Sequence, residues 1–135
     1  MGASSLAPPW HDQATYLEMS ERVVREFPNV RVIATTTRRP RTANRNDWAA
    51  FAYAQGTVHR STEYMDLDVF DRVGGGDAFA AGLIYGLQRG KGMPWALDCG
   101  VAHGALAMTT PGDSSMATLA EVESLMAGGS AGVQR

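Results

Sequence analysis

Three consecutive glycines near the middle of the chain place the strongest constraint on its fold. Gly74, Gly75 and Gly76 follow a stretch that is typical of a β-strand and precede a stretch, beginning at Asp77, that is typical of an α-helix. Glycine reaches backbone dihedral angles that are closed to other residues, and it lets a ligand approach the backbone closely. We therefore expect these residues to interrupt regular structure as a tight turn between a strand and a helix.

The helix that follows makes this turn a candidate anion site. N–H groups in a first helical turn have no partner within the helix, and the helix dipole is positive there, so phosphate groups bind well. Asp77 stands in that turn and is suited to accept a proton from an attacking hydroxyl while the turn holds a transferring phosphoryl group. The segment matches neither a Walker loop nor the dinucleotide fingerprint. The local pattern is equally consistent with a tight turn that has no ligand.

The remaining residues predict four helices and four strands. The predicted helices cover 12–27, 77–88, 94–108 and 119–127, and the predicted strands cover 30–35, 48–54, 57–61 and 64–70. We interpret Gln55-Gly56 as a hairpin turn, Pro111-Gly112-Asp113 as a second turn, and the basic segment 37–47 as a loop. Thr118 and Glu121 predict a capping box for the last helix. This order predicts an α/β domain that lacks several strand–helix units of a complete one.

Composition narrows the classes of function. The chain has 135 residues, of which 44% are hydrophobic, enough for one domain with its own core. The formal net charge of −2 offers no electrostatic attraction for nucleic acid or an anionic membrane, and no apolar run approaches the roughly 20 residues that cross a bilayer. The histidines are too scattered to suggest a metal hydrolase. Cys99, the only cysteine, excludes an intrachain disulfide and suits a cytoplasmic location.

Residues 71–82, which read Asp-Arg-Val-Gly-Gly-Gly-Asp-Ala-Phe-Ala-Ala-Gly, resemble the second signature of the ribokinase-like (PfkB) carbohydrate kinases. That signature runs Asp, two residues, Gly-Ala-Gly-Asp, one residue and Phe, with a glycine close by. Gly75 stands where alanine is usual. The resemblance implies that Asp77 is the catalytic base, that the backbones of Gly74, Gly75 and Gly76 form an anion hole, and that Asp71 lies near a monovalent-cation site.

The stretch Ala105-Leu106-Ala107-Met108-Thr109-Thr110-Pro111-Gly112 is similar to the family's Ala-Leu-x-Val-Thr-x-Pro-Gly, whose helix and loop border the adenine. His103 and Gly104 precede it where small alanines are usual. The resemblance therefore implies that both lie near the nucleotide. For His103, packing between helices is the alternative.

The strand end Thr35-Thr36-Thr37-Arg38 corresponds to the family's Thr-x-Gly, which approaches the nucleotide phosphates, and Arg38 replaces the glycine. Residues 37–48 resemble a subgroup of 2-keto-3-deoxygluconate kinases. The resemblance implies nucleotide binding by Thr37 and Arg38. Arginine also binds carboxylates by bidentate hydrogen bonds, so Arg38 is a candidate contact for a sugar acid as well, whereas Arg39, Arg41 and Arg45 are expected to be solvated.

Together the motifs imply the C-terminal portion of a ribokinase-like three-layer α/β/α fold over residues 14–127, with an incomplete central sheet, a loose lead-in over 1–13 and a flexible tail over 128–135. The resemblance implies ATP-dependent phosphorylation of a sugar or sugar acid hydroxyl, with 2-keto-3-deoxygluconate converted to its 6-phosphate, and it implies Mg²⁺ and a monovalent cation as cofactors. Alternatives are a kinase for a fructose- or ribose-like sugar and a non-catalytic nucleotide-binding or interaction fragment.

One motif of the family has no counterpart in this sequence. Full members of the family are longer, and their Asn-x-x-Glu motif, which helps to organise Mg²⁺, is absent here. We therefore expect the isolated chain to be catalytically incomplete. A separate chain that carries the missing N-terminal half, or a second copy of this chain, is the corresponding expectation for partners.

Overall fold

The computed structural model describes residues 12–111 and 115–128. Its elements are α1 (Gln13–Glu26), β1 (Val32–Pro40), β2 (Arg45–Ala54), β3 (Thr57–Arg60), β4 (Tyr64–Asp68), α2 (Gly75–Gln88), α3 (Met93–Met108) and α4 (Leu119–Met126). The type and the order of all eight elements confirm the helices and strands predicted from the sequence. Most of the lead-in, most of the tail and the Gly112-Asp113 part of the second predicted turn lie outside the described residues.

The four strands form one antiparallel sheet with β2 at its centre. On one side, β1 pairs with β2 along its full length, from Val32↔Ala54 to Pro40↔Asn46. On the other side, β3 pairs with the C-terminal half of β2, and β4 with its N-terminal half. The outer edge of β1 has no partner strand among the described residues, which agrees with the expected incomplete sheet.

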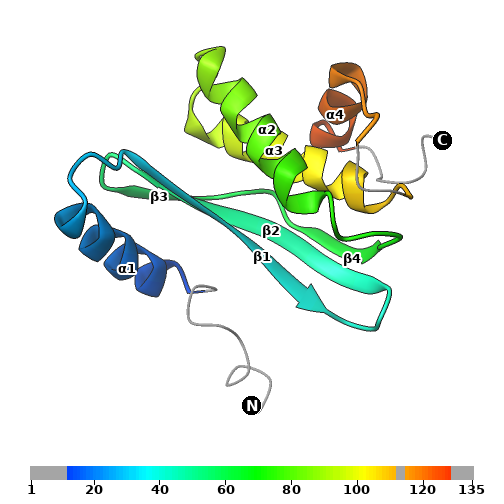
Figure 1. Ribbon diagram of the computed structural model, residues 1–135, viewed down its shortest axis with the longest axis horizontal. Helices are drawn as coiled ribbons and strands as arrows, with labels where there is room; N and C mark the ends of the chain where they lie inside the picture. Colours follow the sequence, from blue (N-terminus) through cyan, green and yellow to red (C-terminus); the bar gives the residue numbers. More distant parts are fainter. Residues whose placement is uncertain (1–11, 112–114, 129–135) are drawn as a thin grey trace.

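Helices cover both faces of the sheet. α1 lies on one face, and α2, α3 and α4 lie on the other (Figure 1). The larger core fills the space between the sheet and the three-helix layer, whereas a smaller core forms beneath α1. There the fully buried Tyr16 stacks on Phe51 with ring centroids 5.3 Å apart, and its hydroxyl donates to the carbonyl oxygen of Ile33 over 3.1 Å.

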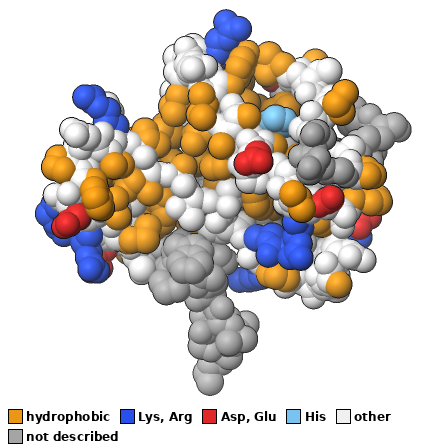
Figure 2. Space-filling model, in the orientation of Figure 1, with side chains coloured by type: hydrophobic (Ala, Val, Ile, Leu, Met, Phe, Trp, Pro, Cys, Tyr) orange, Lys and Arg blue, Asp and Glu red, His pale blue; other side chains and the backbone are white. Residues whose placement is uncertain are grey.

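Small residues allow α2 and α3 to pack closely. A Cβ atom built on Gly82 would lie 2.8 Å from the Cα of Gly100, so a larger side chain would push the helices apart. The other surface of α2 is open, and Ile84 and Leu87 are exposed on it. Hydrophobic side chains are prominent over this helical layer (Figure 2). No helix in the described part of the chain is long and apolar enough to cross a membrane.

Two predicted boundaries were wrong. Residues 37–40 belong to β1 and residues 45–47 to β2, so only 41–44 connect the two strands. The polar composition suggested a loop, but the backbone groups are paired across the hairpin, and the Arg41 N–H donates to the Arg45 carbonyl over 2.7 Å. The second error lies at α2, which begins at Gly75 rather than Asp77 because the last two glycines adopt helical geometry after an N-cap at Gly74.

Two local predictions are confirmed. Gln55 and Gly56 both have positive φ angles, 52° and 78°, as a two-residue hairpin turn of type I′ requires. Thr118 caps α4, and Glu121 completes the capping box.

Candidate functional site

The chain before the glycine turn is tied to the C-terminal end of α3. The N–H groups of Phe70 and Asp71 both donate to the Met108 carbonyl oxygen, over 2.9 and 3.3 Å. The Asp71 carboxylate then accepts the N–H of Val73 over 3.0 Å. These bonds fix where the chain leaves β4 and so fix the position of the turn.

Trp48, on β2, supports the turn from below. Its indole N–H donates to the Val101 carbonyl in α3 over 2.9 Å. Gly104 is buried against this ring: a Cβ there would lie 2.7 Å from the Cζ2 of Trp48 and 3.1 Å from the Gly75 carbonyl oxygen. The structure thus places Gly104 under the glycine turn, where it allows α3, the indole and the turn to meet.

An open pocket of about 380 Å³ lies above this support. Thr36 and Arg38 line it from β1, Arg72 and Val73 from the loop, and Gly75 and Gly76 from the start of α2, with Trp48 and Met108 between them. The structure therefore brings Arg38 and the glycine turn, which are far apart in the sequence, to one site, the glycine-turn pocket.

Thr37 does not line this pocket. Successive side chains of a strand point to opposite faces of the sheet, and the buried Thr37 lines a separate pocket with Arg39 and Asp47. Thr36, which the sequence motif did not single out, lines the glycine-turn pocket.

Arg38 is held by a hydrogen bond from its Nη1 to the Oδ1 of Asn46, 3.3 Å long. Asn46 is only 1% exposed, so this contact anchors the guanidinium to the sheet. The pKa of Arg38 lies below its ordinary value because partial burial removes water from the guanidinium and because the positive charge of Arg72 is near. Arg72 was missed as a site residue, and its only signal in the sequence was its place two positions before the first glycine.

Asp77 follows the glycines as the third residue of α2, and it is exposed. Among the described residues its carboxylate has no hydrogen-bond or ion-pair partner, in contrast to Asp71, which binds within the turn. The Gly75 N–H donates to the Arg72 carbonyl over 3.2 Å. The start of α2 therefore presents an accessible carboxylate in the first helical turn, next to the positive end of the helix dipole, an arrangement that can receive a proton while an anion is bound.

His103 directly precedes Gly104 in α3 but does not line the glycine-turn pocket. It is half-buried, and its Nε2 lies 3.0 Å from the Oγ of Ser115, a contact that fits the packing alternative. Within residues 12–111 and 115–128, no three His, Cys, Asp or Glu side chains gather as a metal site. The described residues therefore offer no cluster of carboxylates that would hold Mg²⁺ by itself.

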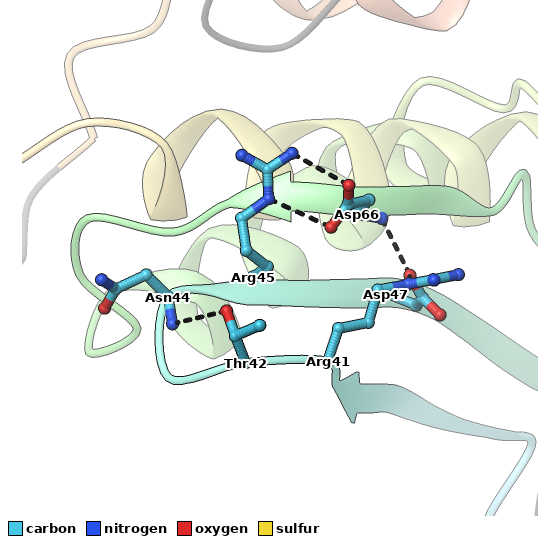
Figure 3. Close-up of polar contacts among 6 residues, drawn as sticks. All are labelled: Arg41, Thr42, Asn44, Arg45, Asp47 and Asp66. Atoms are coloured by element: carbon cyan, nitrogen blue, oxygen red, sulfur yellow. Dashed lines mark hydrogen bonds and ion pairs between the residues drawn. The ribbon is translucent and has the colours of Figure 1, made fainter.

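The other arginines of the β1–β2 hairpin are not all solvated as expected. Arg41 pairs with Asp47 over 2.6 Å, and Arg45 forms a two-pronged contact with Asp66 at 3.0 and 2.9 Å. Asp47 also accepts the backbone N–H of Asp66 over 2.8 Å. Figure 3 shows how these residues link the hairpin to β4, so Arg41 and Arg45 have structural partners, whereas Arg38 faces the pocket.

Comparisons with known proteins identify the family. Residues 47–119, more than half of the chain, match the pfkB family carbohydrate kinase. The chain is 36% identical over 91 residues to 2-dehydro-3-deoxygalactonokinase from Haloferax volcanii (67% of this chain, 28% of that protein). It is 35% identical over 80 residues to 5-dehydro-2-deoxygluconokinase from Bacillus licheniformis (58% of this chain, 24% of that protein).

The fold is also similar to a solved structure. The crystal structure of 2-dehydro-3-deoxygluconokinase from Thermotoga maritima superposes with a TM-score of 0.81 and 32% identity, over 87% of this chain and 35% of that one. The chain thus spans about a quarter to a third of the length of these relatives. The matched residues include β2, the glycine turn, α2 and α3, and they show that the chain belongs to the pfkB family of carbohydrate kinases.

Proposed function

We propose that residues 14–127 form the C-terminal part of a kinase that transfers phosphate from ATP to a hydroxyl of a sugar acid. Asp77 is the general base, and the backbone N–H groups of the Gly74–Gly76 turn stabilise the transferring phosphoryl group. The observation that carries this proposal is the exposed Asp77 carboxylate, unpaired among the described residues, at the start of α2, directly after the two glycines that line the pocket.

The chemistry follows from that arrangement. The positive end of the α2 dipole favours negative charge at the turn. A carboxylate one residue further can take the proton of the sugar hydroxyl as that oxygen attacks phosphorus. The support from Trp48 and Gly104 beneath the turn keeps these groups in place, so little reorganisation is needed during the reaction.

Roles for the other candidates follow the family resemblance. We propose Arg38 as a contact for an anionic group in the glycine-turn pocket, and His103, Gly104 and Thr37 as residues near the nucleotide. Of these, only Arg38 lines the pocket directly. Kinases of this kind commonly use Mg²⁺ with the nucleotide phosphates, and by resemblance a monovalent cation would lie near Asp71. Among the described residues no three His, Cys, Asp or Glu side chains gather to hold a metal.

A sugar acid is the favoured substrate class. The names of the three relatives above all describe kinases of keto-deoxy derivatives of sugar acids. We propose 2-keto-3-deoxygluconate as the substrate for this chain, with its 6-hydroxyl as acceptor. Neutral fructose- or ribose-like sugars are the competing class, and they lack the carboxylate. The buried single cysteine suits a cytoplasmic enzyme.

The test restores the missing part of the fold. Residues 14–127 would replace the matching 35% of the Thermotoga maritima kinase, and phosphate transfer to 2-keto-3-deoxygluconate would be measured for this chimera, for the chain alone and for a chimera with Asp77→Asn. We expect transfer only in the unmodified chimera. A folded chimera that binds ATP yet transfers phosphate to no sugar acid would favour the non-catalytic alternative, and a preference for fructose or ribose would reject the substrate class.

A further inference from the structure

We infer that Arg72 and Arg38 together form a clamp for the phosphate chain of the donor nucleotide, and that this clamp binds polyphosphate without any sugar. The inference rests on the proposed function, because it assigns the donor side of the same site. It adds a residue, Arg72, that the glycine motif alone does not identify.

The two guanidinium groups share one pocket, and neither has an ion-pair partner among residues 12–111 and 115–128. Arg38 reaches it from β1 and Arg72 from the loop before α2. The ion pairs in the described part of the chain use Arg41, Arg45 and Arg60, and neither Arg38 nor Arg72 takes part in one. Two positive charges that face the same space repel each other, and an anion between them offsets this repulsion because it attracts both.

The closest carboxylates do not supply that anion. Asp71 accepts the N–H of Val73 and lines a neighbouring pocket, which Arg72 also borders, rather than the glycine-turn pocket. Asp77 is absent from the lining of the glycine-turn pocket as well. The start of α2 adds further positive potential at Gly75 and Gly76. The lowered pKa of Arg38, caused by partial burial and then by the charge of Arg72, agrees with this uncompensated environment.

The charge of the pocket favours a phosphate chain over a sugar carboxylate. A single carboxylate carries one negative charge, whereas the phosphates of a nucleoside triphosphate carry several and present many acceptor oxygens. Two forked guanidinium groups beside the N-terminal end of a helix match such a chain. The anchor from Arg38 to the buried Asn46 holds one side of the clamp in place before the ligand arrives.

The experiment measures binding of inorganic tripolyphosphate to the full 135-residue chain by calorimetry, without sugar or metal. Arg38→Gln and Arg72→Gln would each weaken binding by about tenfold or more, as expected for loss of a charge-assisted contact. Arg39→Gln is the matched control, because Arg39 is the next residue of β1 but lines the pocket on the other face, and it should change binding by less than about twofold. Circular dichroism would confirm that each variant is folded.

Three results would overturn the clamp. The first is that the folded wild-type chain does not bind tripolyphosphate. The second is that Arg72→Gln leaves tripolyphosphate binding unchanged. The third is that 2-keto-3-deoxygluconate binds in a way that depends on Arg72 while tripolyphosphate does not bind. Asp77→Asn separates this inference from the proposed function, because it should keep or strengthen tripolyphosphate binding. Loss of phosphate transfer in the chimera together with intact, arginine-dependent binding would count against the sugar kinase reaction and not against the clamp.

Discussion

Gly75 and Met108 are packed so closely that Gly75 has no room for a side chain. A Cβ atom on Gly75 would lie 2.9 Å from both the Cγ and the Sδ of Met108, and Met108 is 1% exposed. The family signature has alanine at the position of Gly75. The family stretch that borders the adenine has valine at the position of Met108. The two departures from the family pattern therefore meet in space and compensate for each other.

Gly75→Ala should lower the free energy of unfolding by about 1–3 kcal/mol, the usual cost of overpacking a core. Met108→Val alone should also destabilise, because it leaves a small cavity. The double variant should lose less than the sum of the two single losses, because the alanine fills the space that the valine vacates. Urea unfolding of the four proteins measures this coupling.

Gly76→Ala is the control for this cycle. No atom lies within 4 Å of a Cβ built on Gly76, and the residue is helical, so its substitution should be neutral or slightly stabilising. Strict additivity of Gly75→Ala and Met108→Val would contradict the compensation.

Asp77→Asn should reduce phosphate transfer by the chimera about 10²–10⁴-fold, because the amide cannot accept the proton of the sugar hydroxyl. The affinity for nucleotide should stay nearly constant. Steady-state kinetics measures the loss of phosphate transfer, and a separate binding measurement tests whether the nucleotide affinity is unchanged. Asp98→Asn is a suitable control, since Asp98 accepts the N–H of Thr62 away from the pocket. Retained turnover in Asp77→Asn would sink the general-base role.

Asp47→Ala should destabilise the β1–β2 hairpin strongly. Its carboxylate accepts hydrogen bonds from the Arg41 side chain at 2.6 Å and from the Asp66 N–H at 2.8 Å, and its side chain is only 9% exposed. Loss of this acceptor removes both hydrogen bonds, and a hydrogen bond to a charged group contributes about 1–3 kcal/mol to the unfolding free energy. Thermal and urea unfolding would measure the loss.

Arg45→Ala provides the contrast, because both side chains of the Arg45–Asp66 pair are exposed and such pairs contribute little to stability.

The pKa of Asp47 predicts how the stability of the fold depends on pH. Burial by itself raises it, but the hydrogen bonds from Arg41 and Asp66 prevail, and the pKa lies below the ordinary 3.8. This group therefore contributes stability above that pH, and the contribution is lost as the pH falls through the folded-state pKa. Equal losses for Asp47→Ala and Arg45→Ala would be inconsistent with this account.

Tyr64 should make the fold less stable at high pH. Burial, with a smaller effect from the charge of Asp98, raises the pKa of Tyr64 to about 12 from 10.0. The unfolded chain ionises first, so the stability due to neutral Tyr64 is complete below pH about 10 and is lost as the pH rises to about 12. Ultraviolet titration of tyrosinate should show this late ionisation. In Tyr64→Phe the decline of unfolding free energy over that range should be smaller, and an unchanged decline would contradict the assignment.

Much of the fold was predictable because its signals are local. The strand–turn–helix pattern around Gly74, the hairpin at Gln55-Gly56 and the capping box at Thr118 depend on backbone geometry within a few residues. The boundaries of β1 and β2 were not predictable in this way, because the polar residues that resemble a loop are paired with a strand and with charged partners on β4.

The sequence by itself determined the order of the eight elements, the family and the identity of Asp77 and the glycine turn as the candidate reaction centre, since these depend on short motifs and on periodicity. Only the tertiary structure decided that Arg72 joins Arg38 in one pocket, that Thr36 rather than Thr37 faces it, and that Gly104 supports the turn through Trp48. The physical reason is that strand alternation and helix packing determine which side chains converge, and residues such as Arg38 and Arg72, 34 positions apart, meet only after the sheet and the helical layer have come together.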